Sequence, residues 1–289
     1  MSLMFNRLSV LSQYLIPKQA LTALAGRLAR SQAGGLTTSV IQWFVKRYRV
    51  NMAEAANPDM ASYATFNDFF TRALKSGVRP LRKAPWVCPV DGAISQIGAI
   101  QKAQLFQAKG HSYSTTALVG GDAALAAQFD DGHFATIYLS PRDYHRIHMP
   151  CDGILRRMIY VPGDLFSVNP TTARGVPNLF ARNERVVCVF DTPHGEMVLV
   201  LVGATIVGSM ATVWHGVVNP PRTGRLWEKI YAGKDAITLR QGDEMGRFLL
   251  GSTVVMLFPP SAKLAFNPEW KEALPVQMGT IMGTMIGTR

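Results

Sequence analysis

Cysteine is scarce in this sequence, and its positions argue against the simplest cysteine-based architectures. The three cysteines, Cys88, Cys151 and Cys188, lie far apart and form no Cys-x-x-Cys pair. We therefore expect neither a disulfide framework nor a zinc knuckle, and a reducing compartment is indicated. Long apolar runs are also missing, since no stretch approaches the roughly 18 consecutive apolar residues of a membrane span. We find no secretory signal with a cleavage site.

Acidic residues are missing from the first fifty positions, where basic residues are frequent. The seven basic residues of this stretch are Arg7, Lys18, Arg27, Arg30, Lys46, Arg47 and Arg49. The formal net charge of the whole chain is +11, which favours nucleic acid, an anionic membrane surface or an acidic substrate as partner. Because no helix-turn-helix, zinc-finger or RNP-like pattern is present, we do not expect a nucleic-acid partner.

The same stretch has the periodicity of amphipathic helices. Apolar residues such as Leu21, Leu24 and Leu28 recur at helical spacing, and Pro17 and Gly34-Gly35 divide the stretch into three short helices. Apolar and basic faces without acidic residues are typical of helices that lie in a membrane interface. Packing on the protein's own core and a mitochondrial transit peptide are the alternatives. We predict a membrane-associating region over residues 1–56.

Residues 57–289 form the predicted catalytic domain, and their pattern is mainly β. A helix is predicted over Ala61–Leu74, after which short apolar or alternating runs are separated by Gly, Pro, Asp and Asn clusters. The predicted strands are Ala93–Ile100, Phe134–Leu139, Ile154–Val161, Val186–Phe190, Met197–Val202, Thr205–Met210, Val213–Val218 and Thr253–Phe258. The expected fold class is α+β, with N-terminal amphipathic helices followed by a mainly antiparallel, sandwich- or barrel-like domain.

One predicted strand begins directly after a Gly-Ser pair. Gly251 and Ser252 precede Thr253 and the apolar run Val254–Phe258. Because glycine allows unusual backbone dihedrals, the Ser252 hydroxyl can be brought against the Gly251 carbonyl, where it can attack its own preceding peptide bond. The attack requires a group that removes the hydroxyl proton. Without such a group, the same residues are an ordinary turn into a strand.

Two other segments carry ionisable residues between apolar runs. Asp91 lies in the turn Cys88–Gly92, and His145 and His148 lie in the segment Tyr138–Pro150. An Asp, a His and a Ser can form a nucleophilic triad, in which the carboxylate orients the imidazole and the imidazole takes the hydroxyl proton. A turn-stabilising role for the Asp and structural roles for the histidines are the alternatives. No third ligand at diagnostic spacing accompanies the histidines, so we expect no metal.

Several segments together form a pattern that is specific to one family. They are Thr65-Phe66-Asn67-Asp68-Phe69-Phe70, Pro89-Val90-Asp91-Gly92, Tyr138–Pro150, Tyr160–Asn169 and Leu250-Gly251-Ser252-Thr253. On these segments, and over nearly its whole length, the chain resembles the bacterial phosphatidylserine decarboxylase proenzyme family. In that family the Leu-Gly-Ser-Thr site cleaves itself. The resemblance implies cleavage between Gly251 and Ser252, which gives a β chain of residues 1–251 and an α chain of residues 252–289.

The resemblance also implies roles for individual residues. Asp91, His148 and Ser252 would form the self-cleaving triad, with Asp143 as a second orienting carboxylate. Ser252 would become an N-terminal pyruvoyl group, which is the covalent cofactor. This group forms a Schiff base with the substrate amine and takes up the electrons that remain when CO2 departs. His145 would donate a proton to the resulting carbanion.

The same resemblance implies the substrate, the location and the partners. The expected reaction converts phosphatidylserine to phosphatidylethanolamine, and the loop containing Ser167 would contact the lipid headgroup. The protein would be a homodimer that lies peripherally on an anionic membrane surface, at the cytoplasmic side of the cell membrane. A peripheral membrane serine hydrolase that uses Asp91, His148 and Ser252 without self-cleavage is the alternative, and a non-enzymatic membrane-binding protein is a third reading.

Overall fold

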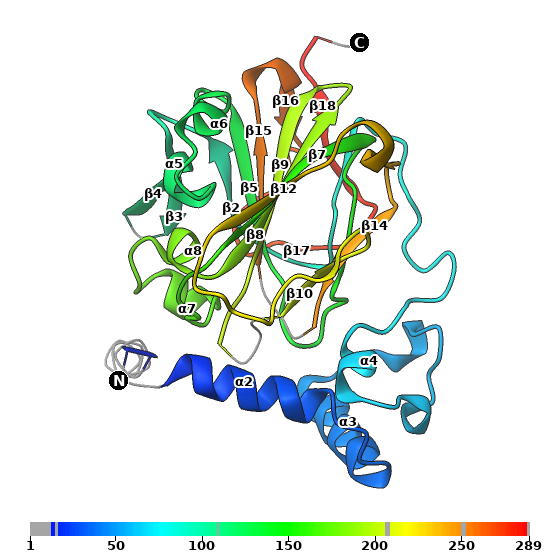
Figure 1. Cartoon of the computed structure of the whole chain (residues 1–289). Helices are drawn as coiled ribbons and strands as arrows, with labels where there is room; N and C mark the ends of the chain where they lie inside the picture. Colours follow the sequence, from blue (N-terminus) through cyan, green and yellow to red (C-terminus); the bar gives the residue numbers. More distant parts are fainter. Residues whose placement is uncertain (1–12, 15–16, 109, 206–208, 250–252, 288–289) are drawn as a thin grey trace.

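The computed structural model describes residues 13–14, 17–108, 110–205, 209–249 and 253–287, and it has a helical segment beside a β-rich body (Figure 1). The α-helices are α2 (Lys18–Ala29), α3 (Gly35–Tyr48), α4 (Phe66–Phe70), α5 (Thr115–Leu118), α6 (Ala123–Ala127), α7 (Pro170–Ala173) and α8 (Leu179–Arg182). The 3-10 helices are η1 (Met52–Glu54), η2 (Met60–Ser62), η3 (Gly233–Asp235) and η4 (Pro260–Ala262). The strands are β1 (Trp86–Val87), β2 (Gly92–Ala99), β3 (Gln104–Ala108), β4 (His111–Ser114), β5 (His133–Tyr138), β6 (Arg146–His148), β7 (Gly153–Val161), β8 (Arg185–Thr192), β9 (Gly195–Val202), β10 (Met210–Thr212), β11 (Gly216–Val217), β12 (Trp227–Ile230), β13 (Ile237–Leu239), β14 (Glu244–Phe248), β15 (Thr253–Phe258), β16 (Leu264–Phe266), β17 (Pro275–Val276) and β18 (Ile281–Met285).

The body is built on one large antiparallel sheet. Its strands follow the order β12-β7-β8-β9-β15-β5-β2-β17, and β13 also pairs with β7. Strand β15 lies near the middle, with Thr253 opposite Tyr138 of β5 on one side and opposite Val202 of β9 on the other. Every residue of β15 is buried, which explains why the sequence reads there as an unbroken apolar run instead of an alternating one.

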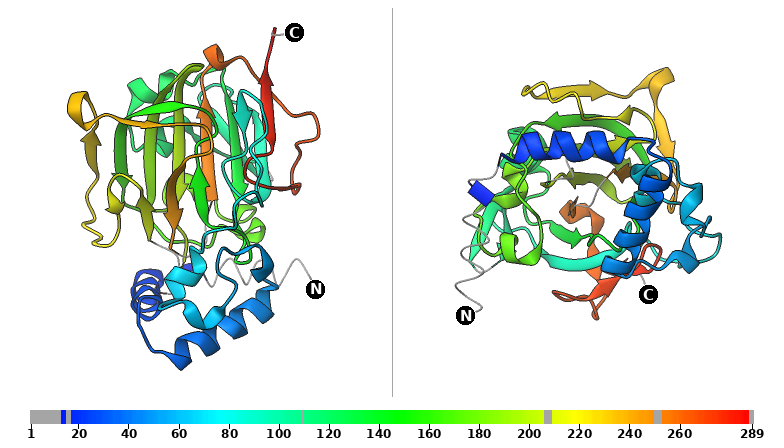
Figure 2. Two further views of the ribbon diagram at one scale, coloured as in Figure 1. Left: turned by 90° about the vertical axis from the view of Figure 1, so that its right-hand side faces the viewer. Right: turned by 90° about the horizontal axis from the view of Figure 1, so that it is seen from below.

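Both faces of this sheet are covered, and side chains alternate between two cores. Met197, Leu199 and Leu201 of β9 belong to one core, which the smaller sheet β11-β10-β14-β6 completes on its side. The intervening Val198 and Val200 belong to the other core, which the short helices α5 to α8 cover. Figure 2 shows the curvature of the large sheet and the smaller sheet lying across it. The body is therefore a layered β structure with a helical cover.

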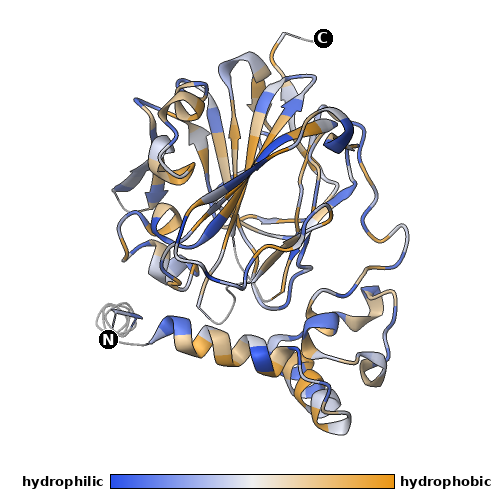
Figure 3. Cartoon of the chain, in the orientation of Figure 1, coloured by the Kyte–Doolittle hydropathy of each residue, from blue (hydrophilic) through white to orange (hydrophobic). Residues whose placement is uncertain are grey.

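The N-terminal helices form a cluster of their own at one end of the body. Ile41 of α3 is fully buried with Val50, Phe69 and Phe70. Apolar side chains on other faces remain exposed, and they are Leu21, Leu24, Leu28, Leu36, Val40 and Trp43. Figure 3 shows apolar residues along α2 and α3. Among the described residues, no helix combines the length and apolar composition needed to cross a bilayer.

The predicted fold class is confirmed, as are the helix boundaries at Pro17 and Gly34-Gly35. The division at residue 56 stays a prediction, and the helical cluster includes residues from both sides of it. The predicted helix over Ala61–Leu74 is wrong in extent. Helix α4 begins only after Thr65, whose side chain and that of Asp68 form a capping box, and it ends at Phe70.

The predicted strands are largely confirmed, with one clear exception. Within Val213–Val218, residues 213–215 form a turn and only Gly216 and Val217 are a strand, β11, which begins at a Gly216 φ of 76°. The predicted strand Thr205–Met210 lies partly outside the described residues, and β10 begins at its last residue.

Candidate active site

Gly251 and Ser252 lie outside the described residues, but the described residues on either side of them contact a single segment. Before the pair, the backbone N–H of Phe248 donates to the carbonyl of His145 at 3.0 Å. After the pair, Thr253 is paired with Tyr138 at the end of β5. The segment Tyr138–His148 therefore contacts the chain both before and after the predicted cleavage site.

Asp143 closes a turn within this segment. Its carboxylate accepts hydrogen bonds from the backbone N–H and the hydroxyl of Ser140, at 2.6 and 2.7 Å. Burial raises the pKa of Asp143, although the bonds from Ser140 oppose that shift. The described contacts of its carboxylate are with Ser140 and, at 3.8 Å, with Arg142. The structure thus places Asp143 as the residue that fixes the turn before the histidines.

His145 is fully buried and neutral. Its Nδ1 lies 2.8 Å from the carbonyl oxygen of Asp143, which can only accept, so Nδ1 carries the proton. Its Nε2 is buried and has no hydrogen-bond partner among the described residues. Burial lowers the pKa of His145 to about 3, and the nearby Arg72 charge contributes to that shift. The centre of the His145 ring lies 4.1 Å from the centre of the Phe70 ring, so α4 packs directly against this imidazole.

His148 has the same tautomer in a different setting. Its Nδ1 donates to the carbonyl of Gly242 at 2.8 Å, and its Nε2 accepts from the hydroxyl of Tyr144 at 3.0 Å. Burial lowers the pKa of His148, while the carbonyl of Gly242 and the charge of Glu244 oppose the shift. The imidazole is therefore a neutral base, and its unprotonated Nε2 already accepts a hydrogen bond from the Tyr144 hydroxyl.

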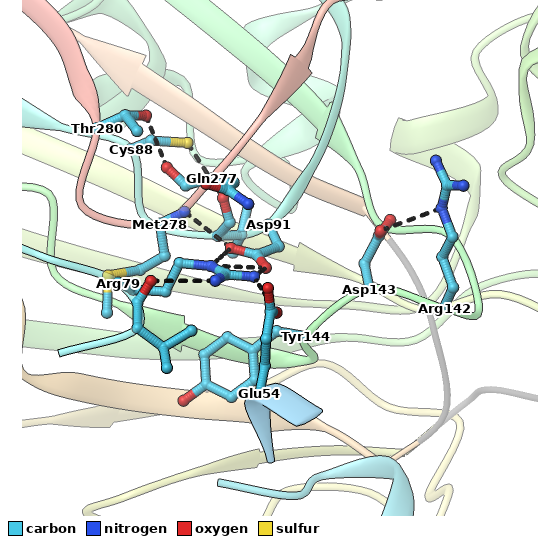
Figure 4. A network of polar contacts seen from close by, with 12 residues as sticks. Glu54, Arg79, Cys88, Asp91, Arg142, Asp143, Tyr144, Gln277, Met278 and Thr280 are labelled. Atoms are coloured by element: carbon cyan, nitrogen blue, oxygen red, sulfur yellow. Dashed lines mark hydrogen bonds and ion pairs between the residues drawn. The ribbon is translucent and has the colours of Figure 1, made fainter. Parts of the chain in front are cut away.

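Asp91 is buried, and its carboxylate forms an ion pair with Arg79. Arg79 Nε lies 3.0 Å from both carboxylate oxygens, a second Arg79 nitrogen lies 2.6 Å from one of them, and the backbone N–H of Met278 donates to the other at 2.9 Å. The same guanidinium reaches Glu54 at 2.8 Å. Figure 4 shows Arg79 between the two carboxylates, with Tyr144 alongside and Asp143 in a separate place. The described contacts of Asp91 do not include a hydrogen bond to His148.

Asp91, Asp143 and Tyr144, but neither histidine, line a cleft of about 410 Å³ between the helical segment and the body. Asp91, Tyr138, Asp143 and Tyr144 come from the body. The helical segment and the chain leaving it contribute Arg49, Asn51, Glu54, Arg72 and Arg79. Two hydrogen bonds join the residues that follow α4 to the segment Tyr138–His148, from Arg72 to the carbonyl of Arg142 at 3.2 Å and from Arg146 to the carbonyl of Thr71 at 2.8 Å. The cleft therefore needs both regions of the molecule.

The sequence analysis did not single out Arg72, Arg79 or Tyr144. Tyr144 stands four residues before His148, but the segment is a loop that leads into β6, so this spacing alone does not predict their contact. Nothing local marks Arg72 or Arg79, since their partners are about 70 and 12 residues away in the chain. Ser167 is placed in a turn, where its hydroxyl accepts from Asn169 and its backbone N–H donates to Gln13. The described residues contain no cluster of three or more metal-ligating side chains.

Comparison with known proteins matches both regions of the chain. A family model described as "Phosphatidylserine decarboxylase" matches residues 66–284, and one described as "PSD" matches residues 8–49. A phosphatidylserine decarboxylase proenzyme of Delftia acidovorans is 74% identical over 279 residues, which cover 96% of this chain and 98% of the relative. Proteins of the same description from Dechloromonas aromatica and Azoarcus sp. are 70% and 67% identical, over 97% and 98% of this chain and 99% and 97% of their own lengths.

Proposed function

The chain belongs to the phosphatidylserine decarboxylase family, and we propose that it cleaves its own Gly251–Ser252 bond to become an active decarboxylase of phosphatidylserine. The observation that carries this proposal is the position of the residues flanking that bond. Phe248 and Thr253 both contact the segment Tyr138–His148, which supplies two neutral, buried imidazoles. Because these imidazoles are buried, water does not compete for their basic nitrogens, and either nitrogen could accept the proton of a serine hydroxyl.

His148 is the base in the proposed self-cleavage. Its Nε2 takes the hydroxyl proton of Ser252, the serine oxygen bonds to the Gly251 carbonyl carbon, and the peptide C–N bond breaks to give an ester and an amine. Loss of the α-proton of residue 252 and of its ester oxygen then releases Gly251 as a carboxylate. Water finally replaces the nitrogen, which leaves as ammonia, and a pyruvoyl group remains. The hydrogen bond from the Tyr144 hydroxyl to Nε2 must break first, so that the serine hydroxyl can bind there.

Asp91 acts on His148 through its charge in this proposal. Its negative charge favours the protonated imidazole, while its oxygens remain bound to Arg79 and Met278. The tautomer of His148 is held instead by the Gly242 carbonyl, which has the role that a carboxylate has in a serine-protease triad. The predicted triad of Asp91, His148 and Ser252 thus stays a prediction, with a longer-range role for its acid.

The residues around the start of β15 suit a pyruvoyl group. The buried Nε2 of His145 and Oγ1 of Thr253 have no hydrogen-bond partner among the described residues, and polar groups in that state favour a polar neighbour. Thr253 would carry the group through its backbone nitrogen, on a fully buried strand that holds it still. When present, a pyruvoyl group supplies an electron sink for the charge that remains when CO2 departs.

His145 is the proposed proton donor in turnover, and its buried state sets a condition on that role. With its pKa lowered to about 3, the imidazole is neutral, so Nε2 must take up a proton before it can give one. The ammonium group of the serine headgroup carries such a proton. Tyr138 and Asp143 line the cleft beside this residue's segment and restrict where the headgroup can lie.

The exposed apolar side chains of α2 and α3 provide the proposed contact with the membrane. Leu24, Leu28 and Trp43 are 56, 62 and 60% exposed on a segment without acidic residues, which suits a bilayer with anionic lipids. The helices lie over the same end of the body as the cleft, so a lipid headgroup has a short path to it (Figure 1). We place the protein on the cytoplasmic side as a homodimer, as the resemblance implies.

Denaturing mass spectrometry tests this proposal. The purified chain should give two products divided at 251/252, with pyruvoyl in place of serine at the head of the smaller one. Ser252→Ala should give one intact chain without decarboxylase activity, while Ser261→Ala, which lies beyond β15, should cleave as the parent does. An intact, active wild-type chain that reacts with a serine-directed phosphonate would instead establish the serine hydrolase.

A further inference from the structure

Arg72 is a buried cation whose guanidinium carbon lies 5.4 Å from the centre of the Phe69 ring, and among the described residues no carboxylate is in direct contact with it. The residue is only 5% exposed, and its single described hydrogen bond runs from one terminal nitrogen to the carbonyl of Arg142. Its Nε is buried without a hydrogen-bond partner, and the described residues form no ion pair with it. Burial of a charge in this state is costly. Arg185 offers a contrast, because three of its nitrogens donate to carbonyl oxygens.

The acidic groups near Arg72 are already engaged elsewhere. Glu54 and Asp91 share the guanidinium of Arg79, and Asp143 accepts from Ser140. Burial lowers the pKa of Arg72, and these carboxylates and Tyr63 oppose that shift only through space. The environment therefore favours the arrival of a further anion, and Arg72 lines the 410 Å³ cleft through which one can enter.

We propose that Arg72 is the receptor for the phosphodiester of the phosphatidylserine headgroup, an inference that rests on the function proposed above. A guanidinium suits phosphate oxygens because it presents several N–H donors in one plane. The headgroup also carries a carboxylate, but that charge disappears as CO2 departs. A cation bound to it would stabilise the substrate more than the transition state and would slow the reaction. The phosphodiester keeps its charge throughout, so binding there costs nothing in the chemical step.

The neighbourhood of Arg72 agrees with this choice. Arg72 follows Phe70 by two residues, and the ring centre of Phe70 lies 4.1 Å from that of His145, the proposed proton donor. Its guanidinium also donates to the carbonyl of Arg142, three residues before His145. In phosphatidylserine only a methylene and an oxygen separate the reacting carbon from the phosphorus. A phosphodiester on Arg72 would thus leave the reacting carbon near His145.

The first experiment compares headgroup binding in the uncleaved Ser252→Ala chain, which needs no pyruvoyl group. Calorimetry should give a dissociation constant for glycerophosphoserine that rises about 10- to 100-fold in Arg72→Gln, because a charge-assisted hydrogen bond is lost. Binding of L-serine, which has the carboxylate but no phosphodiester, should be unchanged. Arg225→Gln removes the same charge at an exposed site outside the cleft and should leave both affinities as they were. Equal losses for the two ligands, or equal losses in the two variants, would overturn the assignment.

The second experiment uses the cleaved enzyme and separates binding from positioning. Arg72→Gln should raise the KM for phosphatidylserine about 10- to 100-fold with little change in kcat, and Arg72→Lys should recover part of that loss. A fall in kcat with unchanged KM, together with slower self-cleavage, would mean that Arg72 only holds the Arg142 carbonyl. If Arg72→Gln does not fold, Arg72→Lys in the Ser252→Ala chain should still bind glycerophosphoserine about tenfold more weakly. An unchanged affinity there would refute the proposal, whereas an uncleaved wild-type chain would refute only the proposed function.

Discussion

The β body and the helical segment use apolar residues in opposite ways. The large sheet is covered on both faces, and β15 has every residue buried. Helix α3 buries one side in a small cluster around Ile41, and α2 buries only small residues such as Ala29, while large side chains such as Leu28 and Trp43 remain exposed. The apolar side chains of the body are already removed from water. Those exposed on α2 and α3 would gain free energy by packing against another surface. In the function proposed above, the reactive groups belong to the closed region and the contact with lipid belongs to the open one.

The two regions meet at the cleft, and each supplies what the other lacks. The body provides Asp91 and the helical segment provides Arg72 to the cleft wall, and behind that wall Phe70 of the helical segment packs against the buried imidazole of His145. Arg79, in the chain that joins the regions, binds a carboxylate from each. The low polarity around His145 is therefore a property of the assembled molecule.

The largest expected effect separates the proposed roles of the two histidines of the body. His148→Ala should slow self-cleavage about 10²- to 10⁴-fold, because the base for the serine hydroxyl is removed. His145→Ala should cleave at close to the wild-type rate yet turn over phosphatidylserine poorly. Time courses on denaturing gels and a CO2-release assay measure the two rates. Loss of cleavage in His145→Ala alone would reverse the two assignments.

The next effect concerns the ion pairs that join the regions. Arg79→Met should lower the free energy of unfolding by about 3–5 kcal/mol, because the buried Asp91 carboxylate loses its counter-charge. Glu54→Gln is the matched control, since Glu54 is more exposed and its loss should cost about 1 kcal/mol or less. Urea denaturation of both variants in the Ser252→Ala chain measures this without interference from cleavage. Equal losses would show that the link between regions, and not the burial of Asp91, sets the cost.

A third prediction sharpens the contrast within helix α3 itself. Ile41→Ala should lower the free energy of unfolding by about 2–4 kcal/mol, since its side chain is fully buried. Trp43→Ser should change that free energy by about 0.5 kcal/mol or less, but it should weaken sedimentation with phosphatidylserine-containing vesicles about tenfold. If Trp43→Ser binds vesicles as the parent does, the exposed face has another purpose.

The smallest effect reports the burial of His145 through pH. Because the folded pKa of about 3 lies below the unfolded value of about 6.5, the unfolded chain takes up a proton first as the pH falls. The contribution of the neutral His145 to the free energy of unfolding is therefore fully present above about pH 6.5, and it is lost progressively as the pH falls to about 3. From pH 7 to pH 5 the wild-type chain should lose up to about 2 kcal/mol more than His145→Gln. Parallel denaturation curves at the two pH values would contradict the burial of a neutral imidazole.

Much of this architecture was readable from local patterns. The apolar run of β15, the helix boundaries at Pro17 and Gly34-Gly35, and the acid-free amphipathic stretch each depend on neighbouring residues. The helix over Ala61–Leu74 was overextended because its periodicity continues while its capping box begins only at Thr65. The turn at Gly216 was missed because the apolar residues around it resemble a strand.

The sequence by itself determined the order of elements, the reactive residue types and the family, because these reside in contiguous motifs such as Leu250–Thr253. Only the tertiary structure decided the partners. It pairs Asp91 with Arg79 and the Nδ1 of His148 with the Gly242 carbonyl, and among the described residues it places no carboxylate in direct contact with Arg72. The physical reason is that burial and hydrogen bonding depend on groups far apart in the chain, and no local pattern records which of them will meet.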